Sequence, residues 1–323
     1  MTHLHRRRLL AAAAVLPFAR PAWAQAWPAK PVKIVVPYPP GGATDILGRM
    51  IAAQLQTAWG QQVIVENKAG AGGVVGNDSV AKSPADGYTV LLSITAIVQA
   101  ATLFPKLPYD PYKDFAPVSQ LSTSTSLFCV SSKLAPKTLA EFVAQVKAEP
   151  GKHAFGSFGN GSSAHIQGEL LRTQAGLDMA HVPYKGAAPM VTDLLGGQLT
   201  SAFVDAGTAR SHMASGALRA LAVTGTERLK MAPDAPLLSE LGYRHFEPKG
   251  WFGFFVPTGT PAAVVKTLAE AIGRAVRTPE ITARIHDLGQ TPVGGTPEAF
   301  AEVIRHDGPL YARLIKDLNI KLD

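Results

Sequence analysis

The chain has 323 residues, with 31 Lys and Arg against 24 Asp and Glu, a hydrophobic fraction of 46% and a single cysteine. This length exceeds what one hydrophobic core usually supports, so two domains are expected. One cysteine excludes an intrachain disulfide and a thiolate metal cluster. Basic residues form no stripe with interleaved aromatics, which argues against nucleic acid as a partner.

Residues 1–24 have the pattern of an export signal. Arg6, Arg7 and Arg8 precede the apolar run 9–18, and an A-x-A-type site predicts cleavage after Ala24. The apolar run is too short for a permanent membrane span. Consecutive arginines also suit a twin-arginine signal, so the general and twin-arginine export routes both stay open. Removal of the signal takes away four arginines and no acids, which leaves 31 − 4 = 27 basic and 24 acidic residues, a net charge of +3.

The first predicted elements alternate between strand and helix. Strands are expected at 31–38, 62–68 and 85–93 from their apolar, β-branched residues. Between the first two, apolar residues recur at helical spacing until Gly60 stops them, and a glycine-rich turn into a helix covers 69–83. This β-α-β-α-β order predicts a parallel sheet covered by helices on both faces.

The segment 103–120 contains four prolines and is predicted to be a long, stiff connection. After it the strand–helix rhythm restarts, with a helix expected at 138–151 that Thr138 introduces. Two helices follow near the end of the chain, at 261–278 and 296–319. The expected organisation is therefore a signal peptide at 1–24, lobe one at 25–128 plus 226–323, and lobe two at 129–225. A discontinuous lobe one requires at least two chain crossings, which would act as a hinge.

Two strand–loop–helix junctions have the same composition. They are "PYPPGGATD" (37–45) and "FGSFGNGSSAH" (155–165), with Thr44, Ser162 and Ser163 at expected capping positions. Free N–H groups at a helix start, with the helix dipole behind them, bind carboxylates and phosphates. Prolines would fix the loop in advance and lower the ordering cost of binding. Alternatively, these residues are ordinary helix caps.

Four further side chains near these loops are candidates for the ligand, and three of them have two interpretations each. Asp45 either faces away from an anion or meets a ligand amine. Tyr184 is placed to close over a ligand, and Lys185 either pairs with a carboxylate or forms a surface ion pair. Asp205, after an apolar strand, is either a helix cap or a contact for a ligand amine.

Known catalytic and nucleotide motifs are incomplete. Position 75 is Val where a dinucleotide loop needs glycine, and Gly156–Gly159 is one residue short of a nucleophile elbow. A serine hydrolase that uses Ser162 or Ser163 with His165 remains an alternative, although no orienting acid is evident. The other histidines lack metal-ligand spacing, so neither a metal nor a cofactor is expected. Cys129 and Trp251 are expected in the core.

Seven blocks of the chain resemble one family in the same order. They are KIVVPYPPGGATD, VENKAGAGG, SPADGYTVLLS, LFPKLPYDPYKDFAPV, GSFGNGSSAH, HVPYKGAAPMVTDLLGGQ and GALRALAVTGTER. They are similar to the Bug-type periplasmic solute receptors, the substrate-binding family of tripartite tricarboxylate transporters. The resemblance implies an α/β protein with the type II periplasmic binding protein fold, in which two lobes with mostly parallel central sheets close on a ligand.

The resemblance also implies a function. We expect a periplasmic, non-enzymatic, monomeric receptor that passes a small organic acid or amino acid to membrane permease subunits; a solute-sensing co-receptor for a signalling system is the alternative. Where the family often has a polar turn after the third strand, this chain has SITAIVQA, so Ser93 and Thr95 are the candidate contacts for the distal group of the ligand. The residues that the resemblance assigns to the ligand are Tyr38, Gly41, Gly42, Ala43, Thr44, Asp45, Asn160, Gly161, Ser162, Ser163, His165, Tyr184 and Asp205.

Overall fold

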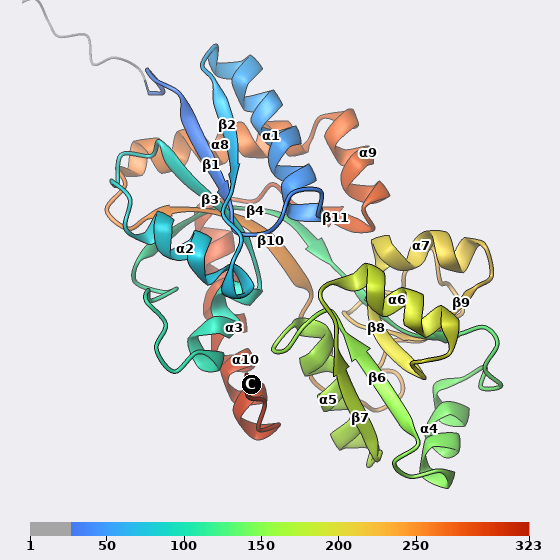
Figure 1. Ribbon diagram of the computed structural model, residues 1–323. Coiled ribbons are helices and arrows are strands. Elements are labelled where there is room, and N and C mark those ends of the chain that lie inside the picture. Colours follow the sequence, from blue (N-terminus) through green and yellow to red (C-terminus); the bar gives the residue numbers. More distant parts are fainter. Residues whose placement is uncertain (1–26, 323) are drawn as a thin grey trace, which may run out of the picture.

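The computed structural model describes residues 27–322. The expected signal peptide and its cleavage site lie outside this range. Within it, no helix combines the length and the apolar character that a membrane span requires. The described chain forms two α/β units, each built around its own sheet (Figure 1).

Unit one contains the six-stranded sheet, with strand order β11-β4-β10-β3-β1-β2. Helix α1 packs on β2 and α8, and α10 packs on α3 and β4. Gly60, in the left-handed conformation, ends α1 as expected. The strands are β1 (Val32–Val36), β2 (Val63–Asn67), β3 (Thr89–Ile94), β4 (Phe115–Ser124), β10 (Gly250–Pro257) and β11 (Gln290–Pro292). The helices are α1 (Ala43–Trp59), the 3₁₀ turn η1 (Ala71–Gly73), α2 (Val74–Ala81), α3 (Ala96–Leu103), α8 (Ala262–Val276), α9 (Pro279–Asp287) and α10 (Pro297–Asp317).

Unit two contains the five-stranded sheet, with strand order β7-β6-β8-β5-β9. Thr138 caps α4 by accepting the N–H of Glu141, as its position before a helical pattern predicts. The strands are β5 (Ser126–Ser131), β6 (His153–Ser157), β7 (Met179–Pro183), β8 (Ser201–Asp205) and β9 (Leu218–Val223). The helices are α4 (Leu139–Ala148), α5 (Ser163–Ala175), α6 (Ala187–Gly196) and α7 (Ala206–Ala214).

Most strands of each sheet run in one direction, as expected, and each sheet also contains strands of the opposite direction. β1 runs parallel to β2 and β3, but β10 is antiparallel to β3 and β4. In unit two, β6 is parallel to β7 and β8, whereas β5 is antiparallel to β8 and β9. The antiparallel strands β5 and β10 are the first strands after the chain passes from one unit to the other. The segment 103–120 is also not wholly a connection, because β4 begins at Phe115.

The chain passes between the units at two places. The first is Thr125, between β4 and β5, and the second is the segment between β9 and β10. Residues from this second segment attach to unit two: Leu238 donates its N–H to Val223 O at 3.0 Å, and Leu237 joins the unit two core. We therefore propose a division in which lobe two starts near 126 and also includes 226–249.

Large aromatic side chains pack where the chain returns to unit one. Trp251 is 1% exposed, packs on Phe255 and Phe300, and donates from Nε1 to the Asp307 carboxylate at 3.1 Å. Cys129 is fully buried within unit two, as expected. Because an engaged indole N–H and buried rings hold β10 against α10, the returning strand is rigidly seated in unit one.

Gly168 sets the distance between α5 and β6. A Cβ at this position would overlap the Phe155 ring, whereas a Cβ on Gly196, in α6, would meet no atom within 4 Å. We expect Gly168→Ala to lower the free energy of unfolding by about 1–3 kcal/mol through overpacking. The matched control Gly196→Ala should be neutral or stabilising, since alanine favours helix. Urea unfolding of both variants checks this, and equal stability of the two would contradict the packing argument.

Candidate functional site

Helix α1 begins without a capping side chain. Its N-cap is Gly42, in an extended conformation, and no side-chain cap hydrogen bond is present among residues 27–322. Thr44 was expected as the cap, but it is the second residue of α1 and only 7% exposed. That expectation was wrong. In any α-helix the first N–H groups have no acceptor within the helix. The N–H groups of Ala43 and Thr44 therefore form a donor corner, which we call the α1 corner.

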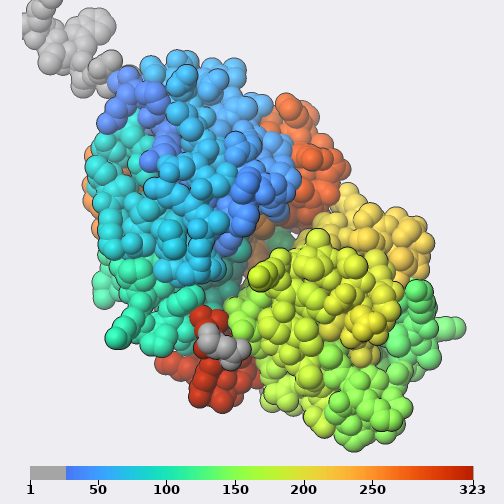
Figure 2. Space-filling model, viewed as in Figure 1, coloured from blue at the N-terminus to red at the C-terminus, as the bar shows by residue number. Residues whose placement is uncertain are grey.

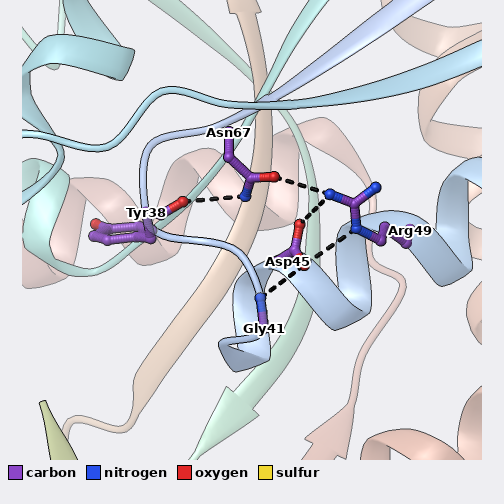
Figure 3. Close-up of polar contacts among 5 residues, drawn as sticks. All are labelled: Tyr38, Gly41, Asp45, Arg49 and Asn67. Atoms are coloured by element: carbon purple, nitrogen blue, oxygen red, sulfur yellow. Dashed lines mark hydrogen bonds and ion pairs between the residues drawn. The ribbon is translucent and has the colours of Figure 1, made fainter.

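Asp45 braces the α1 corner from behind (Figure 3). Its carboxylate accepts the Gly41 N–H at 2.9 Å and pairs with Arg49 at 2.9 Å. Arg49 also donates to the Asn67 side-chain oxygen at 2.9 Å, and the Asn67 amide donates to Tyr38 O at 3.1 Å. Two roles were considered for Asp45, a contact with a ligand amine and a position facing away from an anion. The structure shows its carboxylate engaged by Gly41 and Arg49 inside the protein. The loop between β1 and α1 is thus fixed at both ends by side chains from α1 and β2.

The electrostatics of the brace keep Asp45 charged. Burial by itself raises the pKa of Asp45, but hydrogen bonds from Arg49, Gly41 and Asn67 outweigh it and hold the pKa below its usual value. Tyr38, at the start of the same loop, has a buried hydroxyl with no hydrogen bond of ordinary geometry within 27–322. Burial raises the Tyr38 pKa, and the hydroxyl lies close to the backbone of Gly73. Tyr38 therefore stays neutral and supports the loop against η1.

In unit two, α5 begins with its own side chains closing the first turn. Ser162 is the N-cap and accepts the N–H of His165 at 3.3 Å, as its position predicts. The His165 ring accepts the Gly161 N–H at Nδ1, at 3.0 Å. Ser163 is the first helical residue rather than a cap, and its hydroxyl accepts from Gln99 of α3 at 3.2 Å. These three side chains are thus already engaged within the protein.

A stack of rings lies beneath the start of α5. His165 stacks on His181 with ring centroids 3.7 Å apart, and His181 in turn stacks on Phe155. Burial and the neighbouring His165 lower the pKa of His181 to about 4, so this ring is neutral at physiological pH. His181 Nε2 lies 2.8 Å from the Ser157 hydroxyl. The stack fixes α5 relative to β6 and β7, and His181 has a structural role that sequence spacing did not reveal.

Helix α6 also starts without a capping side chain. Its N-cap is Gly186, at φ 109°, and no side chain accepts from its first turn. Just before it, the Tyr184 hydroxyl donates to Asp193 at 2.7 Å, which commits this group to unit two. Lys185 is exposed and makes no ion pair with any residue in 27–322. We call the start of α6, Gly186 with the N–H of Ala187, the α6 corner. Its sequence signal was the glycine after Tyr184 and Lys185.

Three other candidate contacts are bonded inside their own units. Asp205 is the N-cap of α7 and accepts from the Thr208 N–H at 2.9 Å and the Thr208 hydroxyl at 2.7 Å. Ser93 is fully buried and donates to Asn77 at 3.3 Å. Thr95 accepts the Trp251 N–H at 2.8 Å. For Asp205 the structure selects helix capping, and for Ser93 and Thr95 it shows internal roles.

The two units leave a hollow between them. Figure 1 shows the end of α1 at which the helix begins directed at unit two, on the side where α6 lies. Figure 2 shows the surface hollowed between the blue atoms of the β1–α1 region and the yellow-green atoms of the β7–α6 region. No group of three or more metal-ligating side chains occurs within 27–322. The uncapped starts of α1 and α6 carry backbone N–H groups that no side-chain cap within 27–322 engages.

Comparison with known proteins shows which family this is. Residues 47–320 match the model of the tripartite tricarboxylate transporter family receptor, TctC. The chain belongs to the tripartite tricarboxylate transporter receptor family. It is 37% identical to the protein BugT of Bordetella pertussis over 306 residues, 94% of each chain.

Solved structures agree with this assignment. The periplasmic binding protein BugD is 32% identical, with a TM-score of 0.80 over 91% of this chain and 99% of its own. A protein of R. palustris solved with adipate is 30% identical, with a TM-score of 0.82 over 91% of this chain and 99% of its own. MatC of Rhodopseudomonas palustris, with bound malate, is 30% identical with a TM-score of 0.79 over 90% and 100%. The expected type II periplasmic binding protein fold is confirmed.

The chain is accordingly a solute receptor rather than an enzyme. The geometry agrees, because the Ser162 hydroxyl accepts a backbone N–H from His165, and the Nδ1 atom of that ring is itself an acceptor. Ser163 is engaged by Gln99. The serine hydrolase alternative is therefore wrong.

The Asp45 brace predicts a pH-dependent contribution to stability. Because the folded pKa of Asp45 is lowered, its contribution is complete above the unfolded value of about 3.9 and disappears as the pH falls through the folded value. Asp45→Asn should cost about 1–3 kcal/mol at pH 7. Urea unfolding of wild type and variant at pH 7 and pH 3 measures this. A difference that stays the same at both pH values would contradict the brace.

Proposed function

We propose that this receptor holds a small carboxylate between the α1 corner and unit two, and delivers it to the permease subunits of a tripartite transporter. The observation that carries the proposal is the uncapped start of α1, preceded by Gly41 and Gly42 and braced by Asp45. A carboxylate supplies the acceptor that the first-turn N–H groups lack, and the helix dipole favours its charge. Preorganisation by Asp45 lowers the ordering cost of binding.

Unit two would contribute a second set of donors. The residues expected from the sequence, Asn160 to His165, surround the start of α5, where Ser163 and the next residue are the first-turn positions left uncapped. The α6 corner adds the N–H of Ala187 behind Gly186. We therefore add Gly186 and Ala187 to the proposed site, and assign Ser162, His165 and Asp205 to holding its walls in place.

Small aliphatic dicarboxylates are the ligand class that we propose. Two relatives at 30% identity were solved with adipate and with malate. A backbone site with neutral walls does not require a particular cationic side chain, so it suits a flexible diacid whose second carboxylate is hydrated or meets other N–H groups. Amino acids and tricarboxylates are the competing ligands to test.

The cellular setting follows from the family and the first residues. We propose a periplasmic, monomeric receptor, exported with cleavage near Ala24. Sensing for a signalling partner uses the same solute chemistry and is separated from transport by capture of membrane subunits. Native mass spectrometry of the purified protein, followed by titration with malate, adipate, citrate and aspartate, identifies the ligand class.

Gly42→Val tests the α1 corner directly. The Gly42 backbone is not strained, and an added Cβ would meet only Pro39 O at 3.8 Å, so the fold should tolerate a side chain there. The valine would occupy the approach to the first-turn donors, and we expect at least a tenfold loss of affinity in calorimetric titration with the diacid that binds wild type. The control is Gly196→Val, which is distant from the corner. Unchanged affinity of the Gly42 variant with an unchanged melting temperature would contradict the site.

Proline at the first helical position separates the two corners. Proline is favoured there and removes one N–H donor without disturbing the helix. We expect Ala43→Pro to weaken binding, and Ala187→Pro to do so if the α6 corner contributes as proposed. Ala262→Pro, at the same position of α8, is the matched control and should bind normally. Normal binding by Ala187→Pro would remove α6 from the site while leaving the α1 corner intact.

A further inference from the structure

A hydrogen bond joins the two units beside the hollow. Gln99, on α3 of unit one, donates from Nε2 to the Ser163 hydroxyl at the start of α5 in unit two, at 3.2 Å. Gln99 is 1% exposed, so the bond is shielded from water on the Gln99 side. A buried amide loses its partner if the units separate here, and an unsatisfied buried amide is costly.

Apolar contacts surround this hydrogen bond. Gly161, just before α5, lies against Leu103 of α3 so closely that a Cβ on Gly161 would overlap the Leu103 side chain. Such a Cβ would also lie 3.3 Å from Leu322, near the end of the described chain. Tyr311 of α10 is buried beside Ser163. Three segments of unit one, namely α3, α10 and the end of the described chain, therefore contact the start of α5 in unit two.

The α5 start differs in this respect from the α1 and α6 corners. At α5 the Ser162 hydroxyl caps the helix by accepting the N–H of His165, and the Ser163 hydroxyl is engaged by Gln99. At α1 and α6 the helices start with glycine and no side chain caps them. The contact between Gln99 and Ser163 thus joins the units through the protein's own side chains. The N–H donors at the starts of α1 and α6 stay uncapped.

We propose that Gln99, with Ser163, forms a latch that holds the two units near their closed arrangement before solute binds. Gln99 is then a positioning residue, because it acts on the solute only through the placement of α5 and its unit. A latch that raises the closed fraction lowers the apparent dissociation constant in proportion. One hydrogen bond of ordinary net strength changes that equilibrium by about 2- to 10-fold. The effect on affinity rests on the proposed function, whereas the effect on the distance between the units does not.

Distance measurement between spin labels in solute-free protein tests the latch. Thr57→Cys on α1 and Lys147→Cys on α4 place one exposed label site on each unit, and native Cys129 is fully buried and will not react. We expect Gln99→Leu to shift the distribution toward longer distances. Gln174→Leu is the matched control, because the Gln174 side chain bonds to Arg244 within the segment attached to unit two. Its distribution should coincide with wild type.

Ser163→Ala removes the acceptor and tests the same bond from the other side. It should lengthen the distances as Gln99→Leu does, and the double variant should add nothing further. If Gln99→Leu fails to fold, Ser163→Ala carries the test alone. Distance distributions that match wild type in every folded variant would overturn the latch.

Affinity supplies the second readout. With the diacid that binds wild type, Gln99→Leu should bind about 2- to 10-fold more weakly at an unchanged melting temperature. Failure of every carboxylate to bind wild type would overturn the proposed ligand but leave the distance test of the latch in force. Longer distances with unchanged affinity would overturn the role of Gln99 in positioning.

Discussion

The start of α1 is the constraint on which the rest of the site depends. A helix that begins at glycine has N–H groups without an intrahelical or side-chain acceptor, and burial of such groups away from any acceptor is costly. In this protein these N–H groups lie at the edge of a hollow. Hydrogen bonds of Asp45, Arg49 and Asn67 hold the preceding loop in one conformation. Within residues 27–322 no side chain caps this helix start, and the proposed function assigns the acceptor to the carboxylate of a solute.

The two units solve the same problem at helix starts in different ways. In unit two, α5 and α7 are closed by Ser162 and Asp205, and a stack of Phe155, His181 and His165 supports the first of them. Each of these caps satisfies one backbone donor of the first turn and holds the helix start in place. The starts of α1 and α6 carry no side-chain cap, and the proposed function assigns their N–H donors to the solute. A receptor needs both, because donors that move with their walls lose the benefit of preorganisation.

Local signals found most elements and misplaced several side chains. Gly60 and Thr138 marked a helix end and a helix start correctly, because both act through neighbouring backbone groups. Thr44 was misjudged, since the conformation of Gly42 decides where α1 begins. The role of Asp45 depends on Asn67, at the end of strand β2, which binds the same Arg49 side chain. Spacing along the chain does not reveal that partner.

The sequence by itself determined the two-unit α/β plan, the family and the location of the α1 corner, because hydrophobic periodicity, glycine and proline act over a few residues and seven blocks recur in a fixed order. Only the tertiary structure decided the mixed direction of the sheets, the internal roles of Asp45 and Ser93, and the contact between Gln99 and Ser163. Each of these depends on segments far apart in the chain that meet only after folding. Contacts between segments far apart in the chain are therefore the information that the sequence-based prediction of these loops lacked.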